Sequence, residues 1–146
     1  MSDYDVIVVG AGNAAQAAAM SALENGAKRV AILEKAHEEM RGGNTHWSGG
    51  ILRIAFDDSR ELAPFLPGIE NEFLNFYDGI KPYTKKKYME DLLRVTNGRS
   101  DPTLANILVE NSYDTVRWAV KTAKIECEPA CHVCGVQVNG QWTFPG

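Results

Sequence analysis

Residues 4–34 read YDVIVVGAGNAAQAAAMSALENGAKRVAILE, and this stretch decides the fold. Tyr4–Val9 is β-branched and nearly continuously apolar, which predicts a strand buried on both faces. A helix is expected from about Ala14 to Asn25, and small residues on one side let it lie close to a sheet: Ala15, Ala18, Ala19 and Ala22. Arg29–Glu34 predicts a second strand. Two strands joined by a helix within ~30 residues imply a right-handed parallel crossover and an α/β fold.

A glycine motif stands between the first strand and the helix, reading G-x-G-x-x-A over Gly10–Ala15. Gly10 permits a tight turn, and Gly12 lets the backbone approach a pyrophosphate. The helix N-terminus offers free N–H groups and the positive end of its dipole to phosphates. Glu34 ends the second strand, where a carboxylate accepts ribose hydroxyls and repels a 2′-phosphate. The pattern predicts a dinucleotide site that disfavours NADP, and it leaves NAD and FAD open.

Composition excludes several other classes of protein. The chain is 45% hydrophobic and carries a formal net charge of -4, which gives no electrostatic reason to expect nucleic acid or an anionic membrane as partner. No apolar run approaches the ~18 residues of a spanning helix, and the N-terminus does not resemble a signal peptide. Three cysteines suit a reducing compartment, so we expect a cytoplasmic location.

The rest of the chain predicts loops, then helices, then a hairpin. A polar, glycine-rich loop is expected over 35–50, and an irregular segment with short helical pieces over 57–87. Lys85-Lys86-Lys87 is expected to be a solvated face. A helix is expected over about 88–96. The sequence around Asn139-Gly140 alternates, which predicts a β-hairpin formed by 136–138 and 141–144.

Two further helices are expected before the hairpin. Asp101-Pro102 combines an N-cap acceptor with proline in the first turn, which is a strong helix start. The spacing predicts that the buried side of this helix consists of Leu104, Ile107, Leu108 and Asn111. A separate helix is expected over about 113–124, with inward residues Val116, Ala119, Val120 and Ala123.

The residues after Glu34 carry a family resemblance. Glu34-Lys35 leads into residues 41–50, RGGNTHWSGG. This stretch resembles the FAD-dependent fumarate reductase and succinate dehydrogenase flavoprotein superfamily, and within it soluble dehydrogenases of the tricarballylate dehydrogenase and ketosteroid dehydrogenase kind. Their second strand ends in Glu-Lys and is followed by Gly-Gly-Asn-Ser/Thr and often Ser-Gly-Gly. The resemblance continues through residues 91–99, DLLRVTNGR, and the helices after it.

The resemblance implies a cofactor and a reaction. In that family the second glycine-rich stretch wraps the pyrophosphate, ribityl chain and flavin. The cofactor-binding residues expected here are Gly10, Ala11, Gly12, Asn13, Ala14, Glu34, Lys35, Gly43, Asn44, Thr45, Ser48, Gly49 and Gly50. The implied enzyme is an FAD-dependent oxidoreductase acting on CH–CH bonds, with hydride transfer between flavin N5 and a small organic acid or enone-like substrate. The alternatives are an NAD-binding reductase and a non-catalytic dinucleotide-binding module.

The resemblance also implies a domain division. Residues 1–125 are expected to form the N-terminal part of an FAD-binding domain, and residues 126–146 the start of an inserted substrate-capping domain. In the family, the third sheet strand, the catalytic arginine and the C-terminal flavin-binding segment come later in the chain. We therefore expect these 146 residues to be a fragment that does not turn over substrate alone. Its catalytic residues, substrate and electron partner are not identified.

Two side chains near the second loop invite functional readings. Succinate dehydrogenases attach FAD through a histidine six residues before the later glycine pair, and the equivalent position here is Gly43. Because His46 lies three residues later, we expect FAD to be held non-covalently and His46 to be a packed or solvated side chain, with a flavin-side or substrate-side contact as the alternative. Arg53 could meet an anionic substrate, although an arginine after an apolar pair is more often structural.

Three cysteines form C-x3-C-x2-C at Cys127, Cys131 and Cys134, with His132 between the last two. This spacing occurs in iron–sulfur and zinc sites. Its place in a short hairpin-bearing tail argues against an iron–sulfur cluster, and His132 is poorly placed to close a tetrahedral site with its neighbours. We expect structural or unpaired thiols and no bound metal, with metal binding or redox pairing as the alternative.

Overall fold

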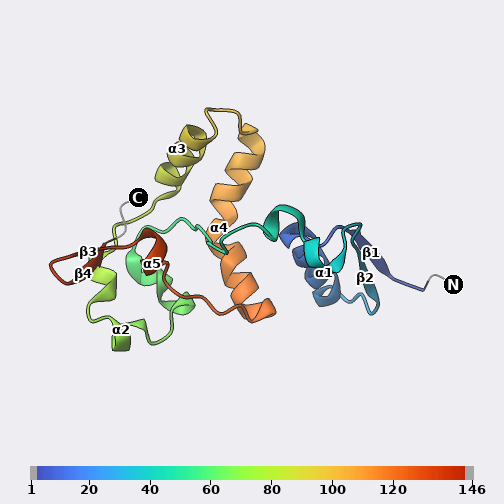
Figure 1. Ribbon diagram of the computed structural model, residues 1–146, viewed down its shortest axis with the longest axis horizontal. Helices are drawn as coiled ribbons and strands as arrows, with labels where there is room; N and C mark the ends of the chain where they lie inside the picture. The colour runs from blue at the N-terminus through green and yellow to red at the C-terminus, as the bar shows by residue number, and fades with distance from the viewer. Residues whose placement is uncertain (1–2, 144–146) are drawn as a thin grey trace. The chain divides into compact units, whose positions relative to one another are not determined.

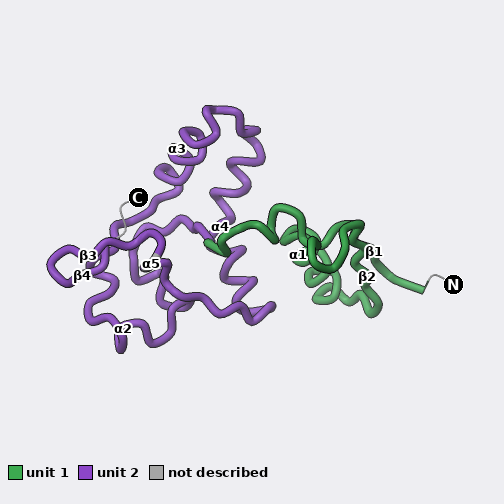
Figure 2. Tube along the Cα trace, viewed as in Figure 1, with its two compact units in different colours: residues 1–51 green, residues 52–146 purple. Residues whose placement is uncertain are grey.

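The structure is a computed structural model that describes residues 3–143. The chain divides into two compact units, residues 1–51 and 52–146 (Figure 2). The boundary predicted near residue 125 separates an FAD-binding domain from a substrate-capping domain. The division into these two compact units does not test it, so it stays a prediction. Within residues 3–143, no helix has the length and apolar character needed to cross a membrane.

The first unit is the predicted βαβ element (Figure 1). Strand β1 (Val6–Val9), helix α1 (Asn13–Glu24) and strand β2 (Val30–Leu33) follow one another. The strands pair in parallel, with Val6 opposite Val30 and Val9 opposite Leu33. Helix α1 packs on both strands and buries Ala15 and Ala19, while Ala22 is half-buried and Ala18 is exposed. Small side chains at this spacing let a helix lie close to a sheet.

The expectation that the first strand is buried on both faces is wrong for this unit. Along β1, Val6 and Val8 are half-buried, whereas Ile7 is 56% and Val9 84% exposed. In β2, Ile32 and Leu33 are exposed as well. Alternate side chains of a strand point to opposite faces, and α1 covers one face only. Among the described residues of this unit, nothing covers the other.

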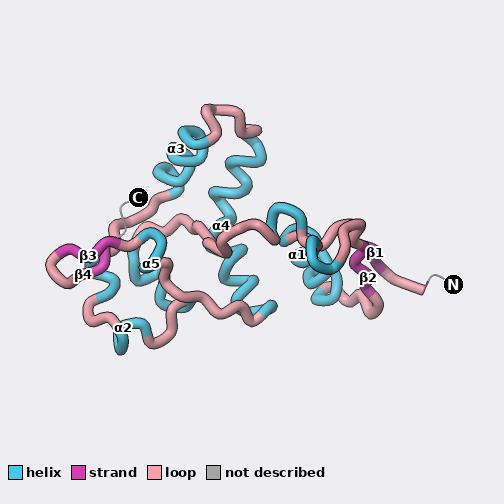
Figure 3. The backbone as a smooth tube through the Cα atoms, viewed as in Figure 1, coloured by secondary structure: helices cyan, strands magenta, loops and turns pink. Residues whose placement is uncertain are grey.

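The second unit begins with short helical turns, as expected for residues 57–87 (Figure 3). They are η3 (Ser59–Phe65), α2 (Ile69–Glu72) and η4 (Phe76–Gly79). After α5 (Cys131–Cys134), strands β3 (Val136–Val138) and β4 (Gln141–Thr143) form the predicted antiparallel hairpin. Phe144, which was included in that hairpin, lies outside the described residues. An apolar cluster joins the turns to the hairpin region: Ile69, Phe76, Tyr77 and Cys131, with Trp142 packed against it.

The hairpin turn has the backbone conformation that its sequence favours. Asn139 has φ 52° and Gly140 has φ 79°. Positive φ at both central residues defines a type I′ turn, whose twist matches that of the flanking strands. The Asn-Gly pair therefore fixes this turn locally.

Helices α3 (Lys85–Val95) and α4 (Pro102–Ala123) differ from the expected helices in extent. Helix α3 begins three residues earlier than predicted because the Thr84 hydroxyl accepts the Lys87 N–H at 3.2 Å and caps the helix. Asp101 caps α4 as predicted, accepting the Leu104 N–H at 2.9 Å. The two helices expected from 101 to 124 are one, because no glycine or proline interrupts residues 103–123.

The predicted buried side of α4 is also wrong. Leu104 is 66% and Ile107 54% exposed, and Leu108 and Asn111 are exposed too. The buried residues are Ala105, Val109 and Ser112. The Ser112 hydroxyl accepts the N–H of buried Ala55 at 3.0 Å and donates to the Val109 carbonyl at 3.0 Å. The small side chains of this buried stripe let the segment around Ala55 lie directly against the helix. Each buried residue follows one of the residues predicted to be buried by one position in the sequence.

The carboxylate of Asp91 is buried beside α3 and gathers polar partners. Asp91 is 4% exposed. Its Oδ2 accepts the Tyr83 hydroxyl at 2.9 Å, and its Oδ1 pairs with Lys87 at 3.2 Å and Arg94 at 3.1 Å. Hydrogen bonds from Tyr83 and Arg94, with Lys87, lower the pKa of Asp91 from 3.8 to about 2. Of the lysines expected to be merely solvated, Lys87 thus pairs with Asp91, and Lys85 pairs with Glu110.

Ser112→Ala should destabilise the second unit by about 1–3 kcal/mol, because the buried Ala55 N–H would lose its acceptor. Urea unfolding of the purified chain measures this. Asn111→Ala is the control, since the exposed Asn111 amide bonds only within its own helix, to the Ile107 carbonyl. Equal unfolding free energies for the two variants would contradict the role given to Ser112.

The depressed pKa of Asp91 predicts an acid-sensitive contribution to stability. Because the folded pKa of about 2 lies below the ordinary 3.8, the contribution is present above pH ~4 and is lost as the pH falls toward 2. Urea midpoints measured between pH 5 and pH 2 should fall less steeply for Asp91→Asn than for the wild type. Parallel profiles for the two proteins would show that Asp91 has the same proton affinity in the folded and unfolded states.

Candidate cofactor-binding site

The glycine turn and the end of β2 are joined by the carboxylate of Glu34. Its Oε2 accepts the Ala11 N–H at 2.9 Å, and its Oε1 accepts the Ala36 N–H at 2.9 Å. The Gly10 N–H donates to the Leu33 carbonyl at 2.6 Å. The acid predicted to lie in register with the glycines does so, and it also holds the turn itself.

The same contacts fix the charge of Glu34. Hydrogen bonds from backbone N–H groups, first that of Ala36 and then that of Ala11, lower the pKa of Glu34 below its ordinary value. The side chain is therefore ionised at neutral pH. The backbone N–H groups of Gly42 and Lys35 lower this pKa as well, so backbone donors from both glycine-rich segments surround the carboxylate.

The second glycine-rich loop lies against the N-terminus of α1. This loop contains the short turns η1 (Glu38–Met40) and η2 (Gly43–Thr45). The Thr45 hydroxyl accepts the N–H of Asn13, the first residue of α1, at 3.1 Å. A Cβ on Gly12 would lie 3.3 Å from both the Gly42 carbonyl and Thr45 Oγ1. Gly12 thus permits the approach of the protein's own loop as well as that predicted for a pyrophosphate.

The start of α1 retains the features that suit a phosphate. The N-cap is Gly12, which supplies no side-chain cap, and the first turn contains no acidic residue. The N–H groups of a first helical turn have no acceptors within the helix, and the helix dipole places positive charge there. Gly10, with φ 105°, has open space where a Cβ would stand. The residues present therefore fit the diphosphate of a dinucleotide.

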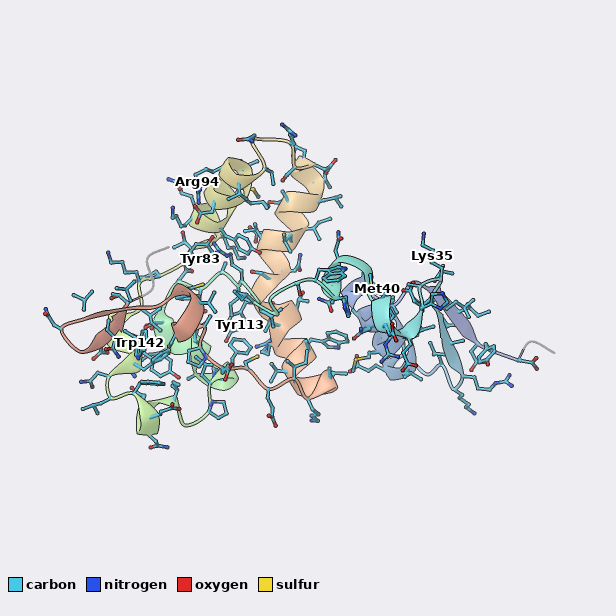
Figure 4. The ribbon with its side chains drawn as sticks, in the orientation of Figure 1. Lys35, Met40, Tyr83, Arg94, Tyr113 and Trp142 are labelled. Carbon is cyan, nitrogen blue, oxygen red and sulfur yellow. The ribbon has the colours of Figure 1, made fainter. Side chains whose placement is uncertain are left out.

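The remaining predicted cofactor residues fall into two groups. Ser48 and Gly50 interact within the loop, because the Ser48 hydroxyl donates to the Thr45 carbonyl at 2.9 Å and accepts the Gly50 N–H at 3.4 Å. The other group is exposed and consists of Asn13, Ala14, Lys35, Gly43, Asn44 and Gly49. Figure 4 labels Lys35 and Met40, which belong to this loop. The assignment of all these residues to a cofactor stays a prediction.

Two residues of this region were missed by the sequence analysis. The Gly42 carbonyl is one of the two groups nearest to Gly12, and the Gln16 side-chain amide donates to the Ala11 carbonyl at 3.1 Å. Adjacent glycines at 42–43 signalled a special backbone there. Nothing local in the sequence distinguished Gln16 from any other exposed polar residue of a helix.

His46 lies exposed at the end of η2. Its ring meets that of Trp47 edge-on, with centroids 4.9 Å apart and planes at 81°. Trp47 is itself exposed. The two rings therefore form an exposed aromatic pair that follows Thr45 in the sequence. A contact between His46 and a flavin stays a prediction.

The three cysteines are free thiols in different surroundings. Cys131 is buried in the apolar cluster of the second unit, Cys127 is half-buried and Cys134 is exposed. Burial raises the pKa values of Cys127 and Cys131, which disfavours their reactive thiolates. Across residues 3–143, no group of three or more His, Cys, Asp or Glu side chains is placed to hold a metal ion. The side chain of His132 lies outside the described part of the chain.

Comparison with known families indicates which cofactor the first unit suits. The family described as FAD binding domain matches residues 5–67. The match includes both the glycine turn and the second glycine-rich loop. It favours FAD over NAD, a choice that the glycine turn and Glu34 alone left open.

Known proteins extend this likeness beyond the first unit. The chain is 32% identical over 128 residues to urocanate reductase of Eggerthella lenta, covering 88% of this chain and 18% of that protein. It is 32% identical over 114 residues to fumarate reductase (cytochrome) of Shewanella frigidimarina, covering 78% and 17% respectively. A soluble pyridine nucleotide transhydrogenase of Enterobacter sp. is 49% identical over 45 residues, which cover only 31% of this chain.

The extent of these matches separates the general nucleotide motif from the family. The transhydrogenase shares a stretch only 45 residues long, whereas the urocanate and fumarate reductases match over most of the chain. The chain spans less than a fifth of the length of those two reductases. The match to the FAD binding domain family and the likeness to both reductases support the predicted resemblance to the fumarate reductase/succinate dehydrogenase flavoprotein superfamily.

Proposed function

We propose that the first unit holds FAD non-covalently and that the protein is an FAD-dependent oxidoreductase acting on a C=C bond of a small organic acid. This proposal rests on one observation. The Glu34 carboxylate and the Thr45 hydroxyl both bind backbone N–H groups at the glycine turn, where α1 begins without a side-chain cap of its own. An ionised carboxylate for a ribose and a positive helix end for a diphosphate are the two groups that a dinucleotide requires.

Each part of this arrangement has a proposed share in holding FAD. Glu34 binds the adenosine ribose, the α1 N-terminus binds the diphosphate, and residues 43–50 bind toward the flavin. When bound, FAD supplies hydride transfer at its N5 atom, while the protein supplies binding, orientation and electrostatics. Gly12 serves this role by letting the loop and the ligand share the space before α1.

The substrate class rests on the relatives. Two proteins that match most of this chain are named for urocanate and for fumarate. We extend a small organic acid substrate to the protein on that ground, with an enone-like compound as the alternative. Turnover is proposed for the whole flavoprotein, and residues 126–146 are proposed to begin its substrate-capping domain. The cytoplasmic location stays a prediction.

An absorbance spectrum of the purified protein tests the cofactor directly. Bound flavin should give bands near about 375 and 450 nm, which belong to the cofactor's own chemistry. Bleaching of the band at the longer wavelength by a reductant, followed by reoxidation with fumarate or urocanate, would support the reaction. A colourless protein that binds NAD and ignores added FAD would contradict the proposal.

Glu34→Gln should weaken FAD binding roughly tenfold, because a charged acceptor for the ribose is lost. Titration of added FAD, followed by the change in its fluorescence, measures the dissociation constant. Glu38→Gln is the matched control, since Glu38 belongs to the same unit and pairs only with exposed Arg41 among its described contacts. Unchanged FAD affinity in Glu34→Gln would refute the assignment of Glu34.

Acid precipitation should release the flavin into the supernatant, because we propose no bond between FAD and His46. The absorbance of supernatant and pellet measures the partition. His46→Ala should leave flavin release unchanged. Yellow colour in the pellet, together with a flavin mass on a peptide that contains His46, would establish covalent attachment instead.

A further inference from the structure

Three arginines of the second unit lie over tyrosine rings. The distances from guanidinium carbon to ring centroid are 5.3, 5.8 and 6.0 Å for Arg53 over Tyr83, Arg60 over Tyr77 and Arg117 over Tyr113. In each pair the aromatic face orients the planar cation. The three arginines therefore allow a comparison at similar geometry.

Arg60 and Arg117 are neutralised by exposed carboxylates. Arg60 lies 3.3 Å from Asp78 and 4.0 Å from Glu70. Arg117 lies 2.9 Å from Asp114. These two arginines have local counter-charges of their own, so an incoming anion would have to displace an acid.

Arg53 differs in its counter-charge. Its Nη1 donates to the Tyr83 hydroxyl at 2.9 Å, and among the described residues its ion-pair partner is Asp91, at 3.9 Å. Asp91 is already engaged by Tyr83, Lys87 and Arg94. One carboxylate thus faces three cations, and the group formed by Arg53, Lys87, Asp91 and Arg94 keeps a formal excess of positive charge.

The backbone two and three residues after Arg53 is held by hydrogen bonds. The Phe56 N–H donates to the Tyr83 carbonyl at 2.9 Å, and the Ala55 N–H donates to Ser112. Tyr83 packs against Tyr88, with ring centroids 5.5 Å apart, and its hydroxyl is bonded to Asp91. Figure 4 labels Tyr83 and Arg94, two members of this network. The Arg53 side chain is nevertheless 53% exposed, so a held guanidinium presents donors to solvent.

We propose that Arg53 is an anion-recognition residue for a carboxylate group of a small organic acid, with Tyr83 and Asp91 as positioning residues. A guanidinium has five N–H donors in a planar fork that matches a carboxylate, and one is used by Tyr83. Arg53 follows Gly50, the last residue of the glycine-rich loop, by three residues in the sequence. The nature of the acid rests on the proposed function, whereas anion binding by Arg53 does not.

Succinate, titrated at constant ionic strength into the purified 15N-labelled chain with and without FAD, tests this inference. The side-chain Nε–H signal of Arg53 should shift saturably in NMR spectra. Arg53→Gln should weaken succinate binding about tenfold, and Arg53→Lys should retain part of it because the charge remains without the fork. The backbone amide spectrum of each variant verifies that it is folded.

Two controls separate recognition from general electrostatics. Arg60→Gln removes a cation that also lies over a tyrosine but is already neutralised, and it should leave succinate affinity within about twofold. Arg94→Gln removes the same charge from the Asp91 group and should have a clearly smaller effect than Arg53→Gln. Equal losses in Arg53→Gln and Arg94→Gln, or wild-type affinity in Arg53→Gln, would overturn the inference.

FAD affinity measured on the same samples distinguishes this inference from the proposed function. Arg53→Gln should bind FAD as the wild type does. If FAD binds and succinate binding is indifferent to Arg53, the anion-recognition role fails and the proposed cofactor stands. If FAD does not bind and succinate binding depends on Arg53, the anion site stands and the proposed function fails.

Discussion

The candidate cofactor site depends on the hydrogen bonds between the Glu34 carboxylate and the backbone. The carboxylate accepts the N–H of Ala11 in the glycine turn and that of Ala36 at the start of the second loop. One side chain therefore sets the spacing between the two glycine-rich segments. Thr45 then reaches the first N–H of α1, and Gly12 leaves room for that approach. An ionised group in this position builds the turn, and its binding of a ribose stays a proposal.

The second unit is organised around a different buried carboxylate. Asp91 gathers Tyr83, Lys87 and Arg94 near one point, and Tyr83 in turn holds Arg53. Burying a charge is costly unless it is paired and hydrogen-bonded, and Asp91 meets both conditions. The excess of cations around it is not needed to neutralise one carboxylate. That surplus distinguishes Arg53 from the other arginines that lie over tyrosines.

The comparisons distinguish a general dinucleotide motif from a likeness that extends over most of the chain. A 45-residue likeness to a transhydrogenase is what a shared dinucleotide motif produces. The likeness to the urocanate and fumarate reductases continues well past that motif. In the first unit, β1 and β2 form a two-stranded sheet whose Ile7, Val9, Ile32 and Leu33 are exposed.

Local signals in the sequence determined the βαβ unit, the place of Glu34, the Asp101 cap and the Asn139-Gly140 turn. Each is written in a few neighbouring residues, because backbone preference, capping and strand alternation act over one turn or one strand. Only the tertiary structure decided which stripe of α4 is buried, that Thr45 accepts the first N–H of α1, and that Asp91 pairs with Tyr83, Lys87 and Arg94. Ser112 is buried and accepts the N–H of Ala55, 57 residues earlier, whereas Leu104 is exposed. Partners so distant in the chain leave no periodic trace in the sequence, so their contacts emerge only when the chain has folded.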